Sequence, residues 1–103
     1  PTIGLLIIHL HLPSCISLKQ KRGCLKPLLS RLHKEFNISV AEIGLNDHWQ
    51  ETLIACALVC NDCSFASQSL QKVHIFIQEQ FPHLQVLDHR IEASKKKGSI
   101  IMD

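Results

Sequence analysis

The chain has 103 residues, 46% of them hydrophobic and 19% charged, which is enough for one domain with one modest core. The formal net charge of +2 is too small to indicate a nucleic-acid-binding protein by itself, so an electrostatic argument depends on where the cations lie. The five cysteines are odd in number and unevenly spaced, which favours reduced thiols in a cytoplasmic protein over a disulfide framework.

The N-terminal run IGLLIIHLHL is too short and too rich in histidine to span a bilayer, and it lacks the basic leader of a signal peptide. We therefore expect no membrane segment and predict a long strand over residues 2–12, ended by Pro13. From Leu6 to Leu12 its even-numbered positions are large and apolar, which predicts a core face, whereas the other face ends in His9 and His11.

A helix is predicted over residues 18–36, with Ser17 as its N-cap. Its apolar residues recur on one face at helical spacing: Leu18, Leu25, Leu28, Leu29, Leu32 and Phe36. Pro27 interrupts this pattern because its ring removes a hydrogen bond and crowds the carbonyl of Gly23, four residues back. We expect either a kink near residues 23–27 or a loop that becomes regular helix only from about Cys24.

Two strands are predicted next, over residues 38–45 and 51–60, with Asn46 and Asp47 forming the turn between them. Glu42 sits alone in a strand of small apolar residues, and we expect it to pair across strands with Arg90 or a histidine.

A second helix over residues 63–80 and a last strand over 84–92 complete the element order βαββαβ. Asp62 caps this helix, whose core stripe is Ala66, Leu70, Val73 and Ile77. With right-handed crossovers the order gives an α+β, ferredoxin-like sandwich, in which a four-stranded antiparallel sheet carries two helices on one face. Residues 1–94 are predicted to form this single domain, and residues 95–103 a basic, flexible tail.

The sheet face without helices is predicted to be apolar. Seven residues should lie on it: Ile3, Leu5, Ile7, Leu53, Ala55, Ala57 and Val59. This is too much apolar surface to leave in water, so we expect a homodimer, or a partner protein, to cover the open face.

Three segments, HLHLPSCISLKQKR, FNISVAEIGLNDHWQ and LVCND, resemble the YlxP-like family of small bacterial proteins of unknown function. The resemblance covers about residues 3–92. The matching positions are Ser17, Leu18, Lys19, Lys21, Arg22, Glu42, Asp47, Trp49 and Gln50. Pro27, the Cys-rich third strand and the three lysines at 95–97 depart from the family pattern. The resemblance implies the ferredoxin-like fold and no established activity; because the family's genes tend to lie near those for translation initiation and ribosome maturation, it also implies an association with the ribosome or RNA.

The segment SLKQKR, residues 17–22, begins the best candidate site for an anion. On a helix, Lys19, Arg22, Lys26 and His33 fall on one flank, with Lys34 close by. Such a stripe can track phosphates, and cations at a helix start oppose the macrodipole, which favours a non-structural role. The alternative is a solvated flank whose lysine stems cover the core edge. The candidate anion- or nucleic-acid-binding residues are Lys19, Lys21, Arg22, Lys26 and Lys34.

His9 and His11 share one strand face and could bind zinc with a third ligand. Candidates for that ligand are Asp88, His89 and Glu42. The alternative is that both histidines bond to neighbouring strands, and no metal site is predicted.

The turn containing Asp47, Trp49 and Gln50 carries the only tryptophan. An exposed indole would indicate a binding surface, and a buried one would fix the hairpin to the core edge, which is the role we favour.

CALVCNDC has the C-x3-C-x2-C spacing of an iron–sulfur cluster motif. Cys56 and Cys60 lie on a strand, however, and should both point toward the helices as small hydrophobic residues. No cofactor is therefore predicted.

No catalytic triad, carboxylate pair or glycine-rich phosphate loop emerges, so the chain is not expected to be an enzyme. The central strands also lack the aromatic residues on which an RRM stacks bases. The leading hypothesis is a cytoplasmic, dimeric accessory factor that touches structured RNA or the ribosome by charge along the first helix. The alternatives are a metal- or small-ligand-binding protein that uses the strand histidines, and a protein-interaction module that uses the open sheet face.

Overall fold

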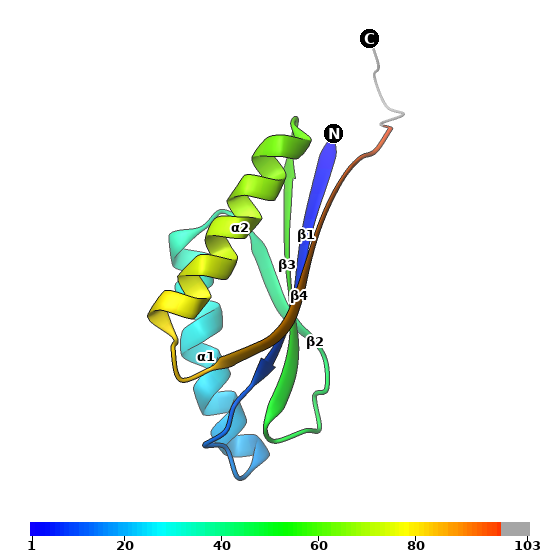
Figure 1. The fold of residues 1–103 in the computed structure, drawn as a ribbon. Coiled ribbons are helices and arrows are strands. Elements are labelled where there is room, and N and C mark those ends of the chain that lie inside the picture. The colour runs from blue at the N-terminus through cyan, green and yellow to red at the C-terminus, as the bar shows by residue number, and fades with distance from the viewer. Residues whose placement is uncertain (98–103) are drawn as a thin grey trace.

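The computed structural model describes residues 1–97 as four strands and two helices in the order βαββαβ (Figure 1). The strands are β1 (Thr2–His11), β2 (Ser39–Gly44), β3 (Glu51–Cys60) and β4 (Gln85–Lys95), and the helices are α1 (Leu18–Glu35) and α2 (Cys63–Gln80). The predicted element order is confirmed, and β3 and α2 begin and end at the predicted residues.

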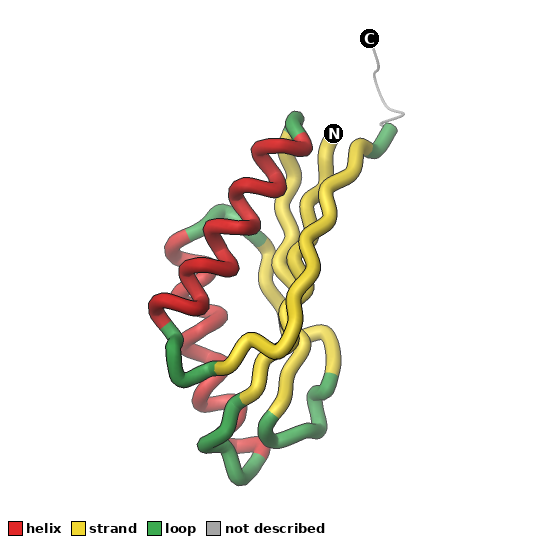
Figure 2. The backbone as a smooth tube through the Cα atoms, in the orientation of Figure 1, coloured by secondary structure: helices red, strands yellow, loops and turns green. Residues whose placement is uncertain are grey.

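The four strands form one antiparallel sheet in the order β2-β3-β1-β4. β1 and β3 occupy its centre and pair over their whole length, from Thr2 opposite Cys60 to His11 opposite Glu51. Both helices cover the same face of the sheet, and the other face is open (Figure 2). The predicted ferredoxin-like α+β fold is therefore confirmed.

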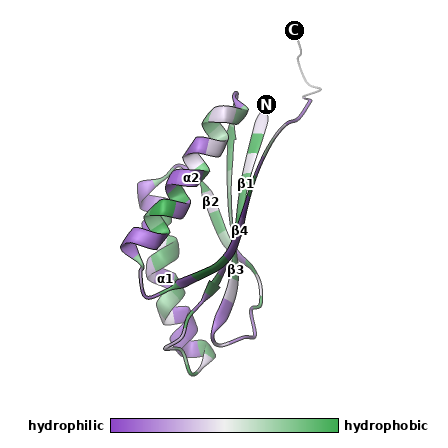
Figure 3. Ribbon diagram, in the orientation of Figure 1, coloured by the Kyte–Doolittle hydropathy of each residue, from purple (hydrophilic) through white to green (hydrophobic). Residues whose placement is uncertain are grey.

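The core lies between the sheet and the helices because side chains alternate between the two faces of a strand. Fully buried apolar residues come from both layers, among them Leu6, Ile8, Leu10 and Ile54 from the sheet, and Leu28, Leu32, Leu70, Val73 and Ile77 from the helices. Figure 3 shows hydrophobic residues along β1 and β3 and a long hydrophilic stretch on the edge strand β4. The predicted core stripe of α2 is confirmed.

Both helices begin at the predicted capping residues. The Ser17 side chain accepts a hydrogen bond from the amide of Gln20 at 3.1 Å, and that of Asp62 accepts one from the amide of Ser64 at 3.1 Å. Each side chain thereby satisfies an amide that has no partner within its own helix.

α1 runs without interruption from Leu18 to Glu35 and contains Pro27, so the predicted loop before Cys24 is wrong. Leu25 lies before the proline and Leu28 after it, and both are buried in the core. Packing of this apolar face on either side of Pro27 outweighs the hydrogen bond that its ring removes.

β4 continues to Lys95, beyond the predicted end at residue 92. Ser94 pairs with Ile3 and Lys95 with Thr2, and the amide of Lys96 donates to the carbonyl of Pro1 at 2.7 Å. The strand extends because β1 offers free backbone groups along its whole length. Of the predicted flexible tail, residues 95 and 96 therefore belong to this ladder, and residues 98–103 lie outside the described residues.

Candidate functional site

Cations are concentrated on the surface of α1. Five of them, Lys19, Arg22, Lys26, Arg31 and Lys34, reach solvent, and the helix carries the single carboxylate of Glu35. Arg31 faces α2, since its guanidinium lies 5.2 Å from the ring centroid of Phe76 and 4.0 Å from the Glu35 carboxylate.

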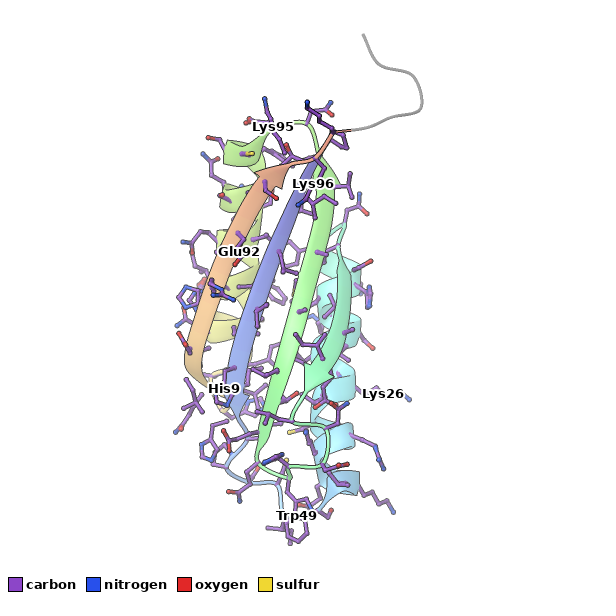
Figure 4. The ribbon with its side chains drawn as sticks, turned by 90° about the vertical axis from the view of Figure 1, so that its right-hand side faces the viewer. His9, Lys26, Trp49, Glu92, Lys95 and Lys96 are labelled. Atoms are coloured by element: carbon purple, nitrogen blue, oxygen red, sulfur yellow. The ribbon has the colours of Figure 1, made fainter. Side chains whose placement is uncertain are left out.

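The other flank of α1, beside β2, carries Lys19, Arg22, Lys26 and His33, which we call the basic flank. All four side chains are exposed, and residues three, four and seven apart share a helix face. Figure 4 shows Lys26 projecting outward from α1 on the side of β2. Lys34 lies about 100° around the helix from His33, so it borders the basic flank and is not part of it.

An open groove of about 340 Å³ runs along the basic flank. It is lined by Arg22, Leu25, Lys26, Leu29, Ser30, His33 and Glu42. The aliphatic stems of the cations therefore leave part of the apolar edge of α1 uncovered. If these side chains served only to cover the edge of the core, no such groove would be expected.

Lys21 does not belong to this surface, although SLKQKR suggested that it would. Its exposed fraction is 1%, and its ammonium lies 2.9 Å from the carboxylate of Glu42. It also donates to the carbonyl oxygens of Leu45 at 2.7 Å and Asn46 at 3.4 Å. With these donors occupied in the interior, Lys21 leaves the set of candidate anion-binding residues.

Glu42 is the centre of this buried polar network. Its carboxylate accepts a hydrogen bond from the Thr52 hydroxyl at 2.6 Å and one from the Asn46 amide at 3.4 Å, in addition to the ion pair with Lys21. The expected pairing with Arg90 or a histidine is wrong, because Glu42 faces the helices, whereas Arg90 faces the open side opposite Ile7. The network joins α1, β2, β3 and the loop between the two strands.

The loop between β2 and β3 is held against the end of β1 and the start of α1. The Gln50 side-chain amide donates to the carbonyl of Cys15 at 3.1 Å, and the Leu12 amide donates to the carbonyl of Gln50 at 2.8 Å. Trp49 projects from this loop at the end of the molecule (Figure 4), with an exposed fraction of 54%. The favoured structural role of a buried Trp49 is therefore wrong.

His9 and His11 are engaged within the sheet. His9 Nε2 lies 2.7 Å from the Glu51 carboxylate, and His11 Nδ1 lies 3.0 Å from the Gln85 side-chain oxygen. Asp88 is opposite His9 on the open face. In the part of the chain that the structure describes, no group of three or more His, Cys, Asp or Glu side chains could hold a metal ion.

Of the other proposed ligands, His89 is on the helix side of the sheet. Its ring stacks on that of His74 in α2, with centroids 3.9 Å apart. Glu42 is on the same side and is bound by Lys21. The strand histidines and these two groups are thus on opposite faces, and the structure does not bring them together.

The cysteines of CALVCNDC do not converge. Cys56 is fully buried in the core, and burial raises the pKa of its thiol to about 12. Cys60 packs against the same core, and its thiol donates to the carbonyl of Asp62 at 3.3 Å. Cys56 therefore acts as the small buried residue that the strand periodicity predicts, whereas Cys60 is half-buried beside the core.

The open sheet face is apolar along its two central strands, and Ile3 and Val59, near one end of β1 and β3, are 39% and 73% exposed. These two residues are cross-strand partners. Charged residues, among them Glu92, border the face along β4 (Figure 4). Neither α1 nor α2 is apolar enough over its length to cross a bilayer.

Sequence comparison places this fold in a family. Residues 3–91 match the sequence model of a protein family described as "Protein of unknown function (DUF503)". The chain belongs to this family. It is similar to the "Uncharacterized protein YlxP" of Bacillus subtilis (strain 168), with 41% identity over 69 residues that cover 67% of this chain and 74% of the relative. The predicted resemblance to YlxP-like proteins is confirmed.

Apart from Leu18, which is half-buried, the motif residues that this DUF503 chain shares with the YlxP-like pattern divide into two groups in space. Ser17, Lys21, Glu42 and Gln50 make internal hydrogen bonds that hold α1 and the β2–β3 loop. Lys19, Arg22, Asp47 and Trp49 are exposed. Lys21, Leu25 and Leu28 share the spacing of one helix face, but the carboxylate and carbonyl oxygens that allow a lysine to be buried there come from β2 and the β2–β3 loop.

Proposed function

We propose that this protein is a cytoplasmic, non-enzymatic accessory factor that binds structured RNA, as part of the ribosome or of its assembly, through α1. The observation that carries the proposal is the charge of the exposed surface of α1, which has five cations and one carboxylate. The chain as a whole has a net charge of only +2, so this positive surface is local. Lys19, Arg22 and Lys26 contact the phosphates, and Lys34 adds to the field beside them.

Phosphate recognition suits this arrangement because a helix presents cations at regular intervals along its length. Lys19 and Lys26 are separated by about 10 Å along the axis, with Arg22 between them. Contacts of this kind position RNA through its backbone and do not read its sequence. A-form RNA is recognised mostly by shape and backbone contacts, which is consistent with a sheet that offers no aromatic platform.

A binding role is also supported by how the buried polar groups are used. Lys21, Glu42 and Thr52 satisfy one another in the interior, as structural groups do. These contacts hold α1 to the β2–β3 loop, so Lys21, Glu42 and Thr52 serve the fold, and the exposed cations of α1 are left to bind the partner.

The test is a titration of the full chain with a structured RNA over a salt series. Replacing Lys19, Arg22 and Lys26 together by alanine should weaken binding. It should also lower the slope of log affinity against log salt by about 2 to 3, because each phosphate contact contributes about 0.7 to 0.9. A charge-matched control replaces Lys72, Lys95 and Lys96, which are exposed and lie away from the basic flank.

Binding that is absent, or that does not respond to salt, would contradict the proposal. An equal loss in both triple variants would show that total charge matters and position on α1 does not. The expected result is a loss confined to the variant of the basic flank, with the control binding as the unmodified chain does.

A second candidate function, self-association through the open sheet face, is supported by a separate observation. Ile3 and Val59 are exposed cross-strand partners at one end of an apolar strip along β1 and β3, and such a strip favours burial against another apolar surface. We propose that a second copy of the chain covers it. The dimer would leave the basic flank free, because α1 lies on the opposite side of the sheet (Figure 2).

A further inference from the structure

Trp49 is the single tryptophan of the chain, and its indole is 54% exposed. Tryptophan has the largest apolar side chain, and an exposed one is uncommon on a small protein without a partner. It is not joined to the open sheet face, since it projects beyond the end of the strands (Figure 4). Its exposure therefore needs an explanation of its own.

The loop that carries Trp49 is fixed by buried interactions. The Lys21 ammonium, itself 1% exposed, binds the carbonyl oxygen of Leu45 at 2.7 Å. Leu45 has a φ of 58°, a left-handed conformation that an L-residue adopts only when its surroundings hold it there. At the other end of the loop, Gln50 bonds to the carbonyl of Cys15. The backbone that carries the indole is therefore fixed at both ends of the loop.

These same contacts place Trp49 beside the start of α1. Cys15 and Lys21 stand on either side of the N-cap of that helix, and both bond to the β2–β3 loop. The first exposed cations of the basic flank, Lys19 and Arg22, belong to the opening turns of α1. Ile16, 67% exposed, adds apolar surface at the same end.

We propose that Trp49 is a stacking platform for an unpaired base of the bound RNA, whose phosphates continue along Lys19, Arg22 and Lys26. The inference rests on the proposed function and adds to it the kind of RNA: a helix with an unstacked nucleotide in a loop or bulge. An aromatic face next to cations suits a nucleotide, since the base stacks while the phosphate meets the charge. A purely apolar partner would leave Lys19 and Arg22 without a role.

The emission of Trp49 gives a direct readout, because the chain contains one tryptophan and no tyrosine. The full chain is titrated with an RNA hairpin that has an unpaired purine loop and, separately, with a blunt duplex carrying the same number of phosphates. The hairpin should quench the emission and bind more tightly than the duplex.

Trp49→Ala should lower affinity for the hairpin by about 5- to 150-fold and leave affinity for the duplex unchanged. Trp49→Phe should restore most of the difference, since a phenyl ring also stacks. Phe65→Ala is the matched control, because Phe65 is an aromatic residue of similar exposure, 57%, on α2; it should bind both RNAs as the unmodified chain does. Urea unfolding of each variant checks that the fold is retained.

The outcomes separate this inference from the one on which it rests. RNA can bind with the expected salt dependence while Trp49→Ala keeps its affinity and the hairpin does not change the emission of the unmodified chain. In that case stacking is overturned, and the proposal that RNA binds the basic flank is retained. If Trp49→Ala weakens hairpin and duplex equally, the indole acts through the loop or the backbone, and stacking is again overturned. An emission that shifts with protein concentration alone would show that a second copy covers Trp49. If neither RNA binds, both proposals fail.

Discussion

The ammonium of Lys21 lies inside the protein because three oxygens meet it there. They belong to the Glu42 carboxylate and to the backbone of Leu45 and Asn46. A buried charge is tolerated only when it is paired and hydrogen-bonded, and removal of either partner leaves the other uncompensated. At the scale of single residues, the clearest predictions concern the Lys21–Glu42 ion pair and the stacked rings of His74 and His89.

Lys21→Ala should destabilise the fold by about 3–5 kcal/mol, because it leaves the Glu42 carboxylate half-buried without its cation. Lys19→Ala is the matched control, since Lys19 is an exposed lysine two positions away and should change stability by no more than about 0.5 kcal/mol. The free energy of unfolding of each variant is measured in urea. A Lys21→Ala variant as stable as the control would show that the ion pair contributes little.

His74 predicts a pH dependence. It is 9% exposed, and its Nε2 has no hydrogen-bond partner among residues 1–97. Burial, and then the neighbouring His89, lower the pKa of His74 below the ordinary value of 6.5. As the pH falls, the unfolded chain therefore takes up the proton first, so the stability from this group is complete above pH 6.5 and is lost below it.

His74→Phe should remove this loss, because phenylalanine keeps a ring against His89 and does not titrate. The free energy of unfolding is measured from pH 8 to pH 5 for both proteins, and their difference isolates His74 from the remaining histidines. One group can contribute at most about 1.4 kcal/mol per pH unit. Parallel curves for the two proteins would contradict the lowered pKa.

At the scale of elements, α1 combines a strong apolar face with a weak point in its backbone. Leu25, Leu28 and Leu32 are buried against the sheet, whereas Pro27 is exposed and donates no hydrogen bond to the carbonyl of Gly23. Tertiary packing supplies most of the stability of a helix in a protein. Packing of the apolar face therefore keeps the residues on both sides of Pro27 helical.

Pro27→Ala should therefore stabilise the protein, by about 1–3 kcal/mol, since it restores a hydrogen bond and removes a steric contact. Greater freedom of the unfolded chain reduces part of this gain. Gly23→Ala should add about 0.5–1 kcal/mol, as nothing lies within 4 Å of an added Cβ. Urea unfolding of both single variants and the double variant measures the gains. A destabilised Pro27→Ala would mean that the proline stiffens a conformation the helix needs.

At the scale of the whole molecule, the two proposed surfaces are on different sides. The helices cover one face of the sheet, and α1 carries the basic flank (Figure 4), whereas β1 and β3 present apolar residues on the opposite face. Self-association and RNA binding therefore do not compete for the same residues. A dimer through the open face would present two basic flanks to one RNA.

The unmodified chain should be dimeric at micromolar concentration, and Ile3→Lys with Val59→Lys should make it monomeric. The two lysines would bring charges into the exposed end of the apolar strip. The strip needs to bury about 800 Å² on each copy for a stable dimer. Sedimentation velocity measures the outcome. Phe65→Lys, at an exposed apolar residue on α2, is the control and should remain dimeric. If the unmodified chain is monomeric, the proposed dimer is wrong.

The sequence by itself determined the fold, because the spacing of apolar residues specifies elements and faces independently of their partners. A period of two fixed the core faces of β1 and β3, helical spacing fixed the stripe of α2, and Ser17 and Asp62 marked the helix starts. The cations of the basic flank could be found in the same way, since residues three and four apart share a face whatever lies opposite.

Only the tertiary structure decided what depends on residues distant in the chain. Lys21 is charged and sits among surface cations in the sequence, yet the carboxylate of Glu42 and the carbonyl of Leu45 bring it inside. β4 extends to Lys95 because β1 lies beside it. The exposure of Trp49 likewise follows from the contacts that hold its loop at the end of the molecule. Periodicity describes one element at a time, whereas ion pairs, strand ends and loop placement arise between elements.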